Sequence, residues 1–378
     1  MINKWFSSSY LSSKQLEKAL KKQLTGSNAL LSIPDHEQAL VEHIAKQTAL
    51  ANVDNVSRTK AYLDFYLEFP EITWSLLAHF VSRNSGWAMT DLKGEFLPLL
   101  LSKQGCESFF HMLERGNWLI FQDAYPQLLL YKESKRRKRP LFHLLHFFGV
   151  SSFMNVCWGH FLKTNDSALL ARALIINEQH YIEERVIQHP TYKENVLDSM
   201  NFHLQEWLHM THILFPKKQV GDTTLTGAVV EDFGSLTSRI RFGIQLYQLL
   251  FQISEVRKQA ELWANAQPHT GSRKDYWPHL FTTTKETLPG ILTTPRLHHC
   301  QLKLGKERVY SPPLRQVWSW VSHPHPERED WFVSERVIDT LFQNEPKTPS
   351  GSILSSYCNS LSKLELAVIA KKAIFLQS

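Results

Sequence analysis

Cysteine is scarce in this sequence, and glycine is less frequent than in an average protein. The four cysteines, Cys106, Cys157, Cys300 and Cys358, stand too far apart for the CxxC pair of a zinc or redox site. Their number and spacing are typical of a reducing cytosol rather than of a secreted disulfide scaffold. The 15 Gly and 17 Pro among 378 residues exclude the collagen-like and proline-rich linker classes.

Short catalytic and targeting motifs are also absent. The sequence holds no GxGxxG, P-loop, HExxH, GxSxG or EF-hand pattern, which removes the common nucleotide-binding, zinc-protease, serine-hydrolase and calcium-binding interpretations. The first 24 residues lack the continuous apolar core of a signal peptide and the start of a myristoylation motif. We therefore expect a cytoplasmic location.

The positive charge is concentrated in one run. The whole chain has a formal charge of +6, and Lys132–Arg139, with six basic residues and one glutamate, accounts for a net +5. A nucleic-acid binder usually spreads basic residues over one face, so the sequence gives no strong nucleic-acid signal. The favoured interpretation of the run is a solvated loop. Weak contact with anionic lipid stays open as an alternative, through Lys135, Arg136, Arg137, Lys138 and Arg139.

Aromatic residues and histidines are abundant, with 22 Phe, 11 Trp, 11 Tyr and 18 His, and helical periodicity dominates the chain. The pattern predicts a mainly α fold class, a large multi-helix domain with long irregular loops and at most a small β-hairpin, at Gln301–Tyr310. Helices are expected at Ser12–Leu24, Asp35–Leu50, Ser57–Phe69, Glu71–Ser82, Asp91–Leu101, Gly105–Arg115, Asn117–Tyr131, Pro140–Leu162, Asp166–Gln188, Lys193–Leu214, Ser235–Ala266, Pro326–Phe342 and Leu361–Leu376.

The chain is expected to divide into three parts. Residues 1–33 form a polar and helical N-terminal extension, residues 34–345 form one large helical domain, and residues 346–378 form a linker and an apolar C-terminal helix.

Pro140–Leu162 is an uncharged stretch of 23 residues, long enough to cross a bilayer as a helix. Its three histidines, its asparagine and its serines would each need a partner in lipid, and no second comparable segment supplies one. We expect a buried central helix, broken near Gly149, with peripheral membrane contact as the alternative.

One short motif suggests a metal. Glu206 and His209 form an ExxH pattern, with His203 and His212 at the same spacing of three. Di-iron bundles require a second ExxH, which is absent, and Glu206 and His209 fall opposite the apolar face of their predicted helix. A solvated helix face is therefore favoured, and no metal is predicted.

Two strips of polar side chains are the stronger candidates for a site. Asn177, His180 and Glu184 recur at spacings of three and four between apolar stripes of one predicted helix. They are interpreted as a structural hydrogen-bond network, or as a polar site with His180 as ligand or general base.

The second strip begins on the helix predicted at Glu71–Ser82 and includes the residue after it, with His79 and Arg83 four positions apart. The chain is then expected to turn at Asn84 and to restart with Asp91 as a helix cap. This corner is interpreted as a turn fixed by capping and an Arg–Asp pair, or as a ligand-binding corner.

We expect the strips to converge on one internal polar pocket. The leading hypothesis is a non-catalytic binding or regulatory protein whose partner is a small ligand or another protein. The residues identify no cofactor. A metal-dependent or hydrolase-like enzyme using the same cluster is the first alternative, and a peripheral membrane protein acting through residues 132–139 is the second. The candidate ligand-binding residues are His79, Arg83, Asn84, Asp91, Asn177, His180 and Glu184.

Two passages are similar to a known family. SRTKAYLDFYLEFPEITWSLLAHFVSRNSGWAMTDLKG and INEQHYIEERV resemble an uncharacterised family of Bacillus and related bacteria, the YppC-like group, which is a domain of unknown function. The resemblance extends from about Ala45 to Trp331. It implies a bacterial origin and an intracellular location, and it supplies no activity or catalytic residue.

Overall fold

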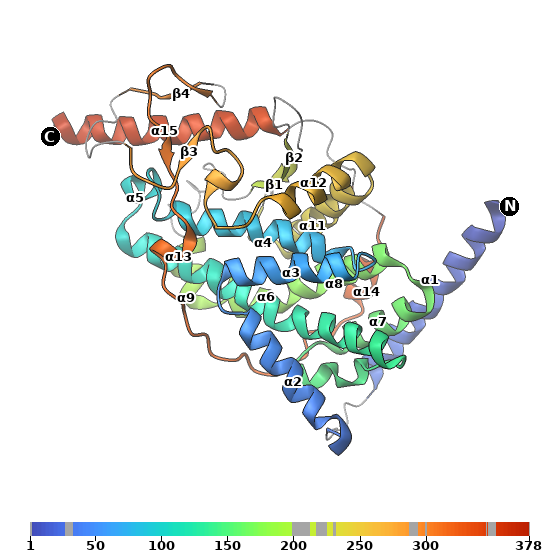
Figure 1. Ribbon diagram of the computed structural model, residues 1–378. Helices are drawn as coiled ribbons and strands as arrows, with labels where there is room; N and C mark the ends of the chain where they lie inside the picture. The colour runs from blue at the N-terminus through green and yellow to red at the C-terminus, as the bar shows by residue number, and fades with distance from the viewer. Residues whose placement is uncertain are drawn as a thin grey trace.

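The computed structural model describes residues 2–26, 33–198, 212–216, 225–229, 232–286, 294–298, 301–344, 346 and 353–377. Helices make up most of these residues, so the predicted mainly α fold class is confirmed (Figure 1). The α-helices are α1 (Ile2–Thr25), α2 (Asp35–Ala51), α3 (Asn55–Glu68), α4 (Trp74–Asp91), α5 (Leu97–Leu100), α6 (Lys103–Arg137), α7 (Ser152–Thr164), α8 (Ser167–Ile182), α9 (Pro190–Tyr192), α11 (Leu236–Phe251), α12 (Ser254–Ala266), α13 (Leu314–Val317), α14 (Arg336–Phe342) and α15 (Leu354–Gln377).

Other helix types and short strands complete the described chain. The 3₁₀ helices are η1 (Phe142–Phe148) and η4 (Arg273–Asp275), and the π-helices are η2 (Glu183–Ile187) and η3 (Lys193–Leu197). The strands are β1 (His212–Pro216), β2 (Leu225–Val229), β3 (Phe281–Thr282), β4 (Leu297–His298), β5 (Gln301–Leu302) and β6 (Val309–Tyr310).

The strands pair two by two. β1 and β2 are antiparallel, β4 and β5 are antiparallel, and β3 and β6 are parallel. The hairpin predicted within Gln301–Tyr310 is therefore wrong, because its two halves pair with β4 and β3 instead of with each other. The Gly305 turn separates them without closing a ladder.

The turn predicted at Asn84–Gly86 is also wrong, because α4 runs through it without interruption. Asn84 Nδ2 donates to Phe80 O (2.7 Å), and Asn84 Oδ1 accepts from Leu214 N (3.1 Å), so this side chain fastens β1 to the helix. A Cβ on Gly86 would lie 2.3 Å from Asn55 Oδ1. Residues that resemble a turn in the sequence thus serve close packing, and Asp91 lies in the last turn of α4 instead of capping a helix.

α6 joins two helices that the sequence predicted separately. It begins where the Ser102 hydroxyl accepts from Gly105 N (3.0 Å), continues through Gly116 and Pro126, and ends at Lys138 with φ 55°. Its buried side chains from Phe109 onward pack in both hydrophobic cores, and this packing outweighs the local preference of Gly and Pro to end a helix. α6 crosses the middle of the molecule (Figure 1).

The uncharged stretch Pro140–Leu162 is broken as predicted. The 3₁₀ helix η1 ends at Gly149, whose φ of 74° favours glycine, and α7 follows. Leu144, Phe153 and Trp158 in this stretch are fully buried in the core. Among the described residues, no helix has the combination of length and apolar character that a membrane crossing requires.

Several predicted helices have other limits in the structure. Ser235–Ala266 is divided into α11 and α12, and in the stretch predicted as Pro326–Phe342 only α14 is helical. Residues 318–334 form no helix or strand, and we call them the extended segment. This segment runs from α13 to α14 around the outside of the molecule (Figure 1). The predicted helix Lys193–Leu214 is wrong at its end, because residues 212–214 belong to β1. Residues 199–211, with the predicted ExxH at Glu206 and His209, lie outside the described residues.

Buried side chains form two hydrophobic clusters. One surrounds Phe80 and Trp158, and the other surrounds Trp87 and Trp277. Leu16 of α1 joins the first cluster and Leu361 of α15 joins the second, so both terminal helices contribute to a core. The division into residues 1–33, 34–345 and 346–378 stays a prediction.

The described cysteines differ in state. Cys106 and Cys157 are free and buried, as expected of packing residues. Cys358 is disulfide-bonded, which departs from the pattern expected in a reducing compartment.

Candidate functional site

The structure separates the predicted site residues into two groups. His79, Arg83, Asn84 and Asp91 belong to α4, whereas Asn177 and His180 of α8 and Glu184 of η2 form the other group. The described residues show no hydrogen bond or ion pair between the two groups.

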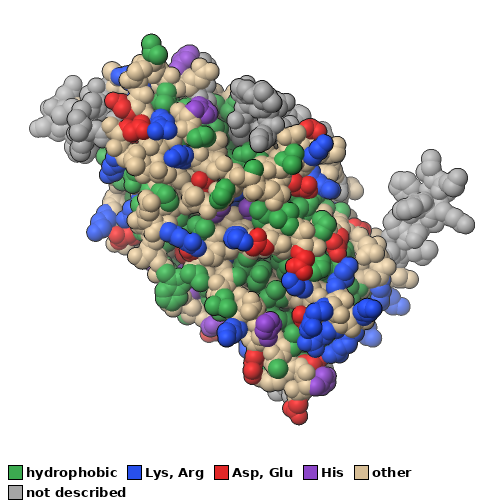
Figure 2. Space-filling model, viewed as in Figure 1, with side chains coloured by type: hydrophobic (Ala, Val, Ile, Leu, Met, Phe, Trp, Pro, Cys, Tyr) green, Lys and Arg blue, Asp and Glu red, His purple; other side chains and the backbone are tan. Residues whose placement is uncertain are grey.

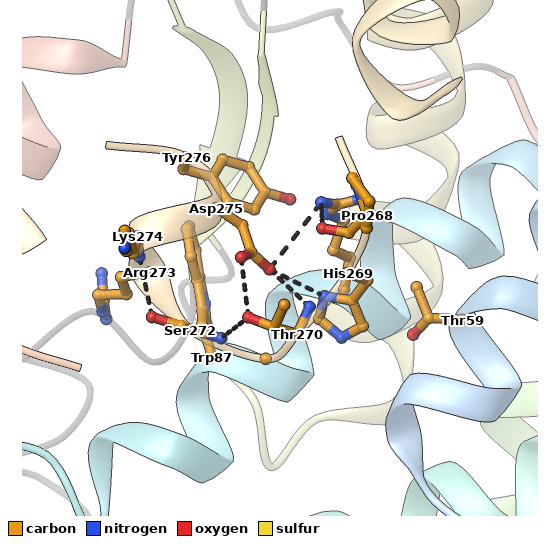
Figure 3. A network of polar contacts seen from close by, with 12 residues as sticks. Thr59, Trp87, Pro268, His269, Thr270, Ser272, Arg273, Lys274, Asp275 and Tyr276 are labelled. Atoms are coloured by element: carbon orange, nitrogen blue, oxygen red, sulfur yellow. Dashed lines mark hydrogen bonds and ion pairs between the residues drawn. The ribbon is translucent and has the colours of Figure 1, made fainter. Parts of the chain in front are cut away.

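Part of the α4 group, His79 and Arg83, contacts the polar network formed by residues 268–276. Figure 3 shows this network around Asp275. His79 Nδ1 is 2.9 Å from Thr59 O, and Arg83 Nη2 donates to Pro268 O (2.9 Å). The Arg83 guanidinium also lies 4.3 Å from the centre of the Trp263 ring. Burial lowers the pKa of His79 well below its ordinary value, and the Arg83 charge lowers it further.

Asp275 is the acceptor at the centre of this network. Its carboxylate accepts from Thr270 N (2.7 Å) and from the Thr270 hydroxyl (2.8 Å), and it lies 4.0 Å from Arg83 Nη2. His269 completes the network, with Nε2 at 2.8 Å from Asn55 Oδ1. Burial lowers the pKa of His269 to about 4, so this imidazole is neutral at pH 7. These contacts fasten residues 268–276 to α3 and α4.

Asp91 pairs with an arginine, as the sequence suggested, but the partner is Arg273 and not Arg83. Arg273 donates from Nε (2.7 Å) and Nη2 (2.6 Å) to Asp91 Oδ2, and its guanidinium covers the Trp87 ring at 4.6 Å. Together with the Asn84 contacts to β1, this pair gives the α4 group a structural role in holding elements together.

The other group opens onto a cleft of about 990 Å³. His180 and Glu184 line this cleft, and the other five predicted residues are not part of its lining. Its walls are α6, the segment from His180 to Asn195, and the extended residues 321–331. We call this feature the α6 cleft.

One wall is a polar stripe of α6 that sequence reasoning missed. Gln104, Ser108, His111 and Arg115 follow one another at spacings of four, three and four, which places them on one helix face. The sequence shows this spacing, but polar residues on one helix face are usually exposed to solvent, so the spacing alone did not indicate a site. Only the extended segment opposite makes this face a wall.

Two π-helices border the cleft. η2 supplies Glu184 and Arg185, and η3 supplies Asn195. A π-turn holds more residues than an α-turn, which alters the direction of successive side chains, and such turns occur frequently at functional sites. Here two residues adjacent in sequence both line the cleft.

Arg115 and Arg185 hold the opposite wall by its backbone. Arg115 Nη1 donates to Pro324 O (2.8 Å), and Arg185 Nη2 donates to Glu327 O (3.3 Å) and Glu329 O (3.2 Å). Neither arginine forms an ion pair with a carboxylate of the described chain. Burial lowers the pKa of Arg115, and the nearby Arg185 charge also lowers it. The cleft therefore contains two neighbouring cations that have no ion-pair partner among the described residues, although the Arg185 charge also acts on the buried Asp123 carboxyl.

Trp331 connects the cleft to the interior. Its ring stacks on His180, and its Nε1 donates to Asn177 Oδ1 (3.1 Å). Asn177 Nδ2 in turn donates to the buried Asp123 carboxylate. Burial lowers the pKa of His180 to about 4, which makes it neutral at pH 7 and a weak general base. Two residues of the predicted strip, Asn177 and His180, are thus connected through Trp331 from the core to the cleft, and Glu184 takes no part in these contacts.

A buried charge network lies behind His323, another residue of the cleft lining. His323 Nε2 is 3.9 Å from Glu114 Oε1, and Glu114 Oε2 accepts from Arg58 Nη2 (2.5 Å). All three side chains are about 5% exposed or less. Sequence reasoning missed this network because its members lie up to 265 positions apart and meet only through the fold.

Three of the four acidic residues of the cleft occupy its rim. Glu184, Glu327 and Glu329 are exposed. Asp330 is committed to α7, because its carboxylate accepts from the Ser151 hydroxyl (2.6 Å) and from Ser152 N (3.0 Å).

Residues 50–350 match a family described as protein of unknown function (DUF2515). The chain belongs to this DUF2515 family. It is 48% identical to the uncharacterized protein YppC of Bacillus subtilis (strain 168) over 261 residues, which cover 69% of this chain and 80% of that protein. The resemblance to the YppC-like group is therefore confirmed. No solved structure matches the chain.

In this DUF2515 protein, the basic run at the end of α6 is compensated by acids. Lys135 pairs with Glu71 (3.3 Å), Arg136 and Arg137 pair with Glu133 (2.6 and 3.1 Å), and Arg139 pairs with Glu37 (2.8 Å). On the face shown in Figure 2, acidic and basic side chains are interspersed over much of the surface, and Lys and Arg side chains gather toward its lower right. The pairing reduces the charge that the run offers to an anionic lipid surface.

The described part of this DUF2515 protein has no group of three or more His, Cys, Asp or Glu side chains placed to hold a metal ion. His180 stacks on Trp331, and Glu184 is exposed at the rim of the cleft. Among the described residues, these two do not form a metal-binding group with a third His, Cys, Asp or Glu.

Proposed function

We propose that this protein binds a small polar molecule in the α6 cleft and acts as a non-catalytic binding or regulatory protein. The observation that carries the proposal is the pair Arg115 and Arg185, whose charges are not paired by any described carboxylate and which line a cleft of about 990 Å³. That volume is at the upper end of the range typical of small-molecule sites.

The walls of the cleft support this proposal. The His180–Trp331 stack offers an aromatic surface beside the two arginines. Hydrogen bonds from both arginines fix the extended segment, so the polar groups are largely positioned before a ligand arrives. A few fixed polar groups beside an aromatic surface are typical of a small-molecule site.

A fragment screen followed by ligand-observed NMR tests the proposal. His189 is exposed and lines the cleft, whereas His279 is exposed and is not part of the lining, so His189→Ala and His279→Ala form a matched pair. We expect fragments that bind the wild type and the His279→Ala variant and bind the His189→Ala variant more weakly. Hits that respond equally to both substitutions, or no hits, would contradict a site in the cleft.

The enzyme hypothesis has a separate test. If His180 acts in metal-dependent or hydrolytic chemistry, metal content or hydrolysis of model esters should be lost in His180→Ala. We further propose a cytoplasmic location, which the two free thiols Cys106 and Cys157 support and the disulfide at Cys358 opposes. Fractionation of bacterial cells, with immunodetection of the protein, decides between the compartments.

A further inference from the structure

The arginine pair of the α6 cleft has hydrogen-bond donors to spare. A guanidinium carries five N–H donors. Arg115 uses Nη1 for Pro324 O, and no hydrogen bond from its Nε or Nη2 to a described residue occurs. Arg185 uses Nη1 for Tyr181 O (3.1 Å) and Nη2 for the two glutamate carbonyls, which leaves its Nε. Backbone carbonyls accept these bonds without cancelling the positive charge.

The position of the two arginines favours binding of an anion between them. Arg115 and Arg185 lie close enough for their charges to interact, and burial of Arg115 weakens the screening by water. Two such cations without a carboxylate repel each other, and an anion between them removes that repulsion while accepting charge-assisted hydrogen bonds. Arginine forks match the geometry of phosphate and carboxylate groups.

The acidic residues at the rim restrict the charge that the rest of the ligand can carry. Glu184, Glu327 and Glu329 are exposed around the cleft, so a long polyanion would bring further negative charges close to them. Asp330 does not compete for the arginines, because Ser151 and Ser152 hold its carboxylate. A single anionic group fits beside the two arginines, and an uncharged or cationic remainder fits beside the acidic side chains.

Resting on the proposed function, we propose that the ligand of the α6 cleft carries one compact anionic group, a phosphate or a carboxylate, bound by Arg115 and Arg185. His111, one helical turn before Arg115 on the same face of α6, is placed to add a hydrogen bond to the ligand. The proposal excludes nucleic acid and other long polyanions as ligands of this cleft.

Isothermal titration calorimetry of the full chain tests the proposal with three probes. Phosphoethanolamine and β-alanine share an ammonium group and differ in carrying a phosphate or a carboxylate, so they distinguish the two anions. Tripolyphosphate is the polyanion. We expect saturable binding of phosphoethanolamine or β-alanine, and weaker binding of tripolyphosphate.

Substitutions assign that binding to the arginines. Arg115→Gln and Arg185→Gln should each lower the affinity for the bound probe by roughly tenfold or more, since one charge-assisted contact is lost. Arg328→Gln is the control, because Arg328 is exposed on the same extended segment and is not part of the lining. Far-UV circular dichroism checks that each variant is folded, and Arg115→Lys, which keeps the charge but loses the fork, should bind at an intermediate level.

Three results would overturn the inference. The first is that Arg328→Gln weakens probe binding as much as Arg115→Gln and Arg185→Gln do. The second is that tripolyphosphate binds more tightly than the small probes, and the third is that neither small probe binds. If uncharged fragments still bind in a manner sensitive to His189→Ala while both small probes fail, the inference is wrong and the proposed binding function stands. If no fragment binds in that manner either, both are wrong.

Discussion

The rings of His180 and Trp331 stack with their centres 4.5 Å apart and their planes 10° from parallel. His180 belongs to α8 and Trp331 to the extended segment, so the stack joins the two walls of the α6 cleft at one point. Because Trp331 also donates to Asn177 of the same helix, its ring is held to α8 at two points. Through these contacts, Trp331 links the buried Asn177 to the wall of the cleft.

Replacing Trp331 should separate the two contributions of its ring. Trp331→Phe keeps an aromatic face for His180 and loses the hydrogen bond to Asn177, which should cost about 1 kcal/mol of unfolding free energy. Trp331→Ala also loses the stack and its packing, and should cost about 2 to 4 kcal/mol. Urea unfolding measures both values, and equal losses would show that the stack does not stabilise the fold.

Asp123 should make stability depend on pH. Burial raises the pKa of Asp123 to about 7 in the folded protein, against an ordinary value of 3.8, although Asn177 and Gln127 donate to its carboxylate. The folded state therefore binds the proton more tightly than the unfolded state. The resulting stabilisation is complete below about pH 4 and is lost as the pH rises to about 7, by up to about 4 kcal/mol.

Asp123→Asn tests this dependence. The amide cannot ionise, so unfolding free energies measured in urea between pH 4 and 7 should fall less steeply than in the wild type. Asp64→Asn is the matched control, because Asp64 is 55% exposed and pairs with Lys60 on the surface. An unchanged slope in Asp123→Asn would mean that this carboxyl is ionised throughout the range.

The buried pair of Glu114 and Arg58 should be far more important for stability than a surface pair. Glu114→Gln leaves the Arg58 charge buried without a counter-charge, and should cost about 3 to 5 kcal/mol. Asp64→Asn breaks the exposed pair with Lys60 and should cost less than about 1 kcal/mol. Denaturant midpoints compare the two, and similar losses would contradict the buried network behind His323.

Two helical glycines should respond oppositely to alanine. In Gly86→Ala the added Cβ would lie 2.3 Å from Asn55 Oδ1 and 2.6 Å from His269 Nε2, so the network of Figure 3 must shift, at a cost of about 1 to 3 kcal/mol. In Gly116→Ala no atom lies within 4 Å, and the better helix propensity should add about 0.5 to 1 kcal/mol. Thermal unfolding gives the sign of each change, and a shift in the same direction for both would refute this account of Gly86.

Local patterns predicted the helices well and their ends less well. Periodicity depends on neighbouring residues, which is why α3 and α8 begin near their predicted positions. Gly116 in α6 and Asn84 in α4 suggested breaks, but their surroundings in the fold keep both helices continuous. The helix predicted at Pro326–Phe342 was wrong in its first part and begins only at Arg336, because the backbone carbonyls of Glu327 and Glu329 accept from Arg185 instead.

The candidate site was predicted in the part that a single helix contains. His180 and Glu184 were found because helical spacing places them on one strip, and both line the cleft. Arg115 and His323 were not found, because only tertiary structure brings α6 and the extended segment to that strip. Which side chains face each other across a cleft is not encoded in any local spacing.

We expect ligands to enter the α6 cleft and not the buried network around His79 and His269. A histidine-selective ¹H–¹³C NMR titration with the tightest-binding fragment tests it most directly, with signals assigned by single His→Gln variants. We predict that the signals of His111, His180, His189 and His323 shift with a shared saturation curve, while those of His79 and His269 stay in place. Shifts confined to His79 and His269, or none at the four cleft histidines, would contradict the account.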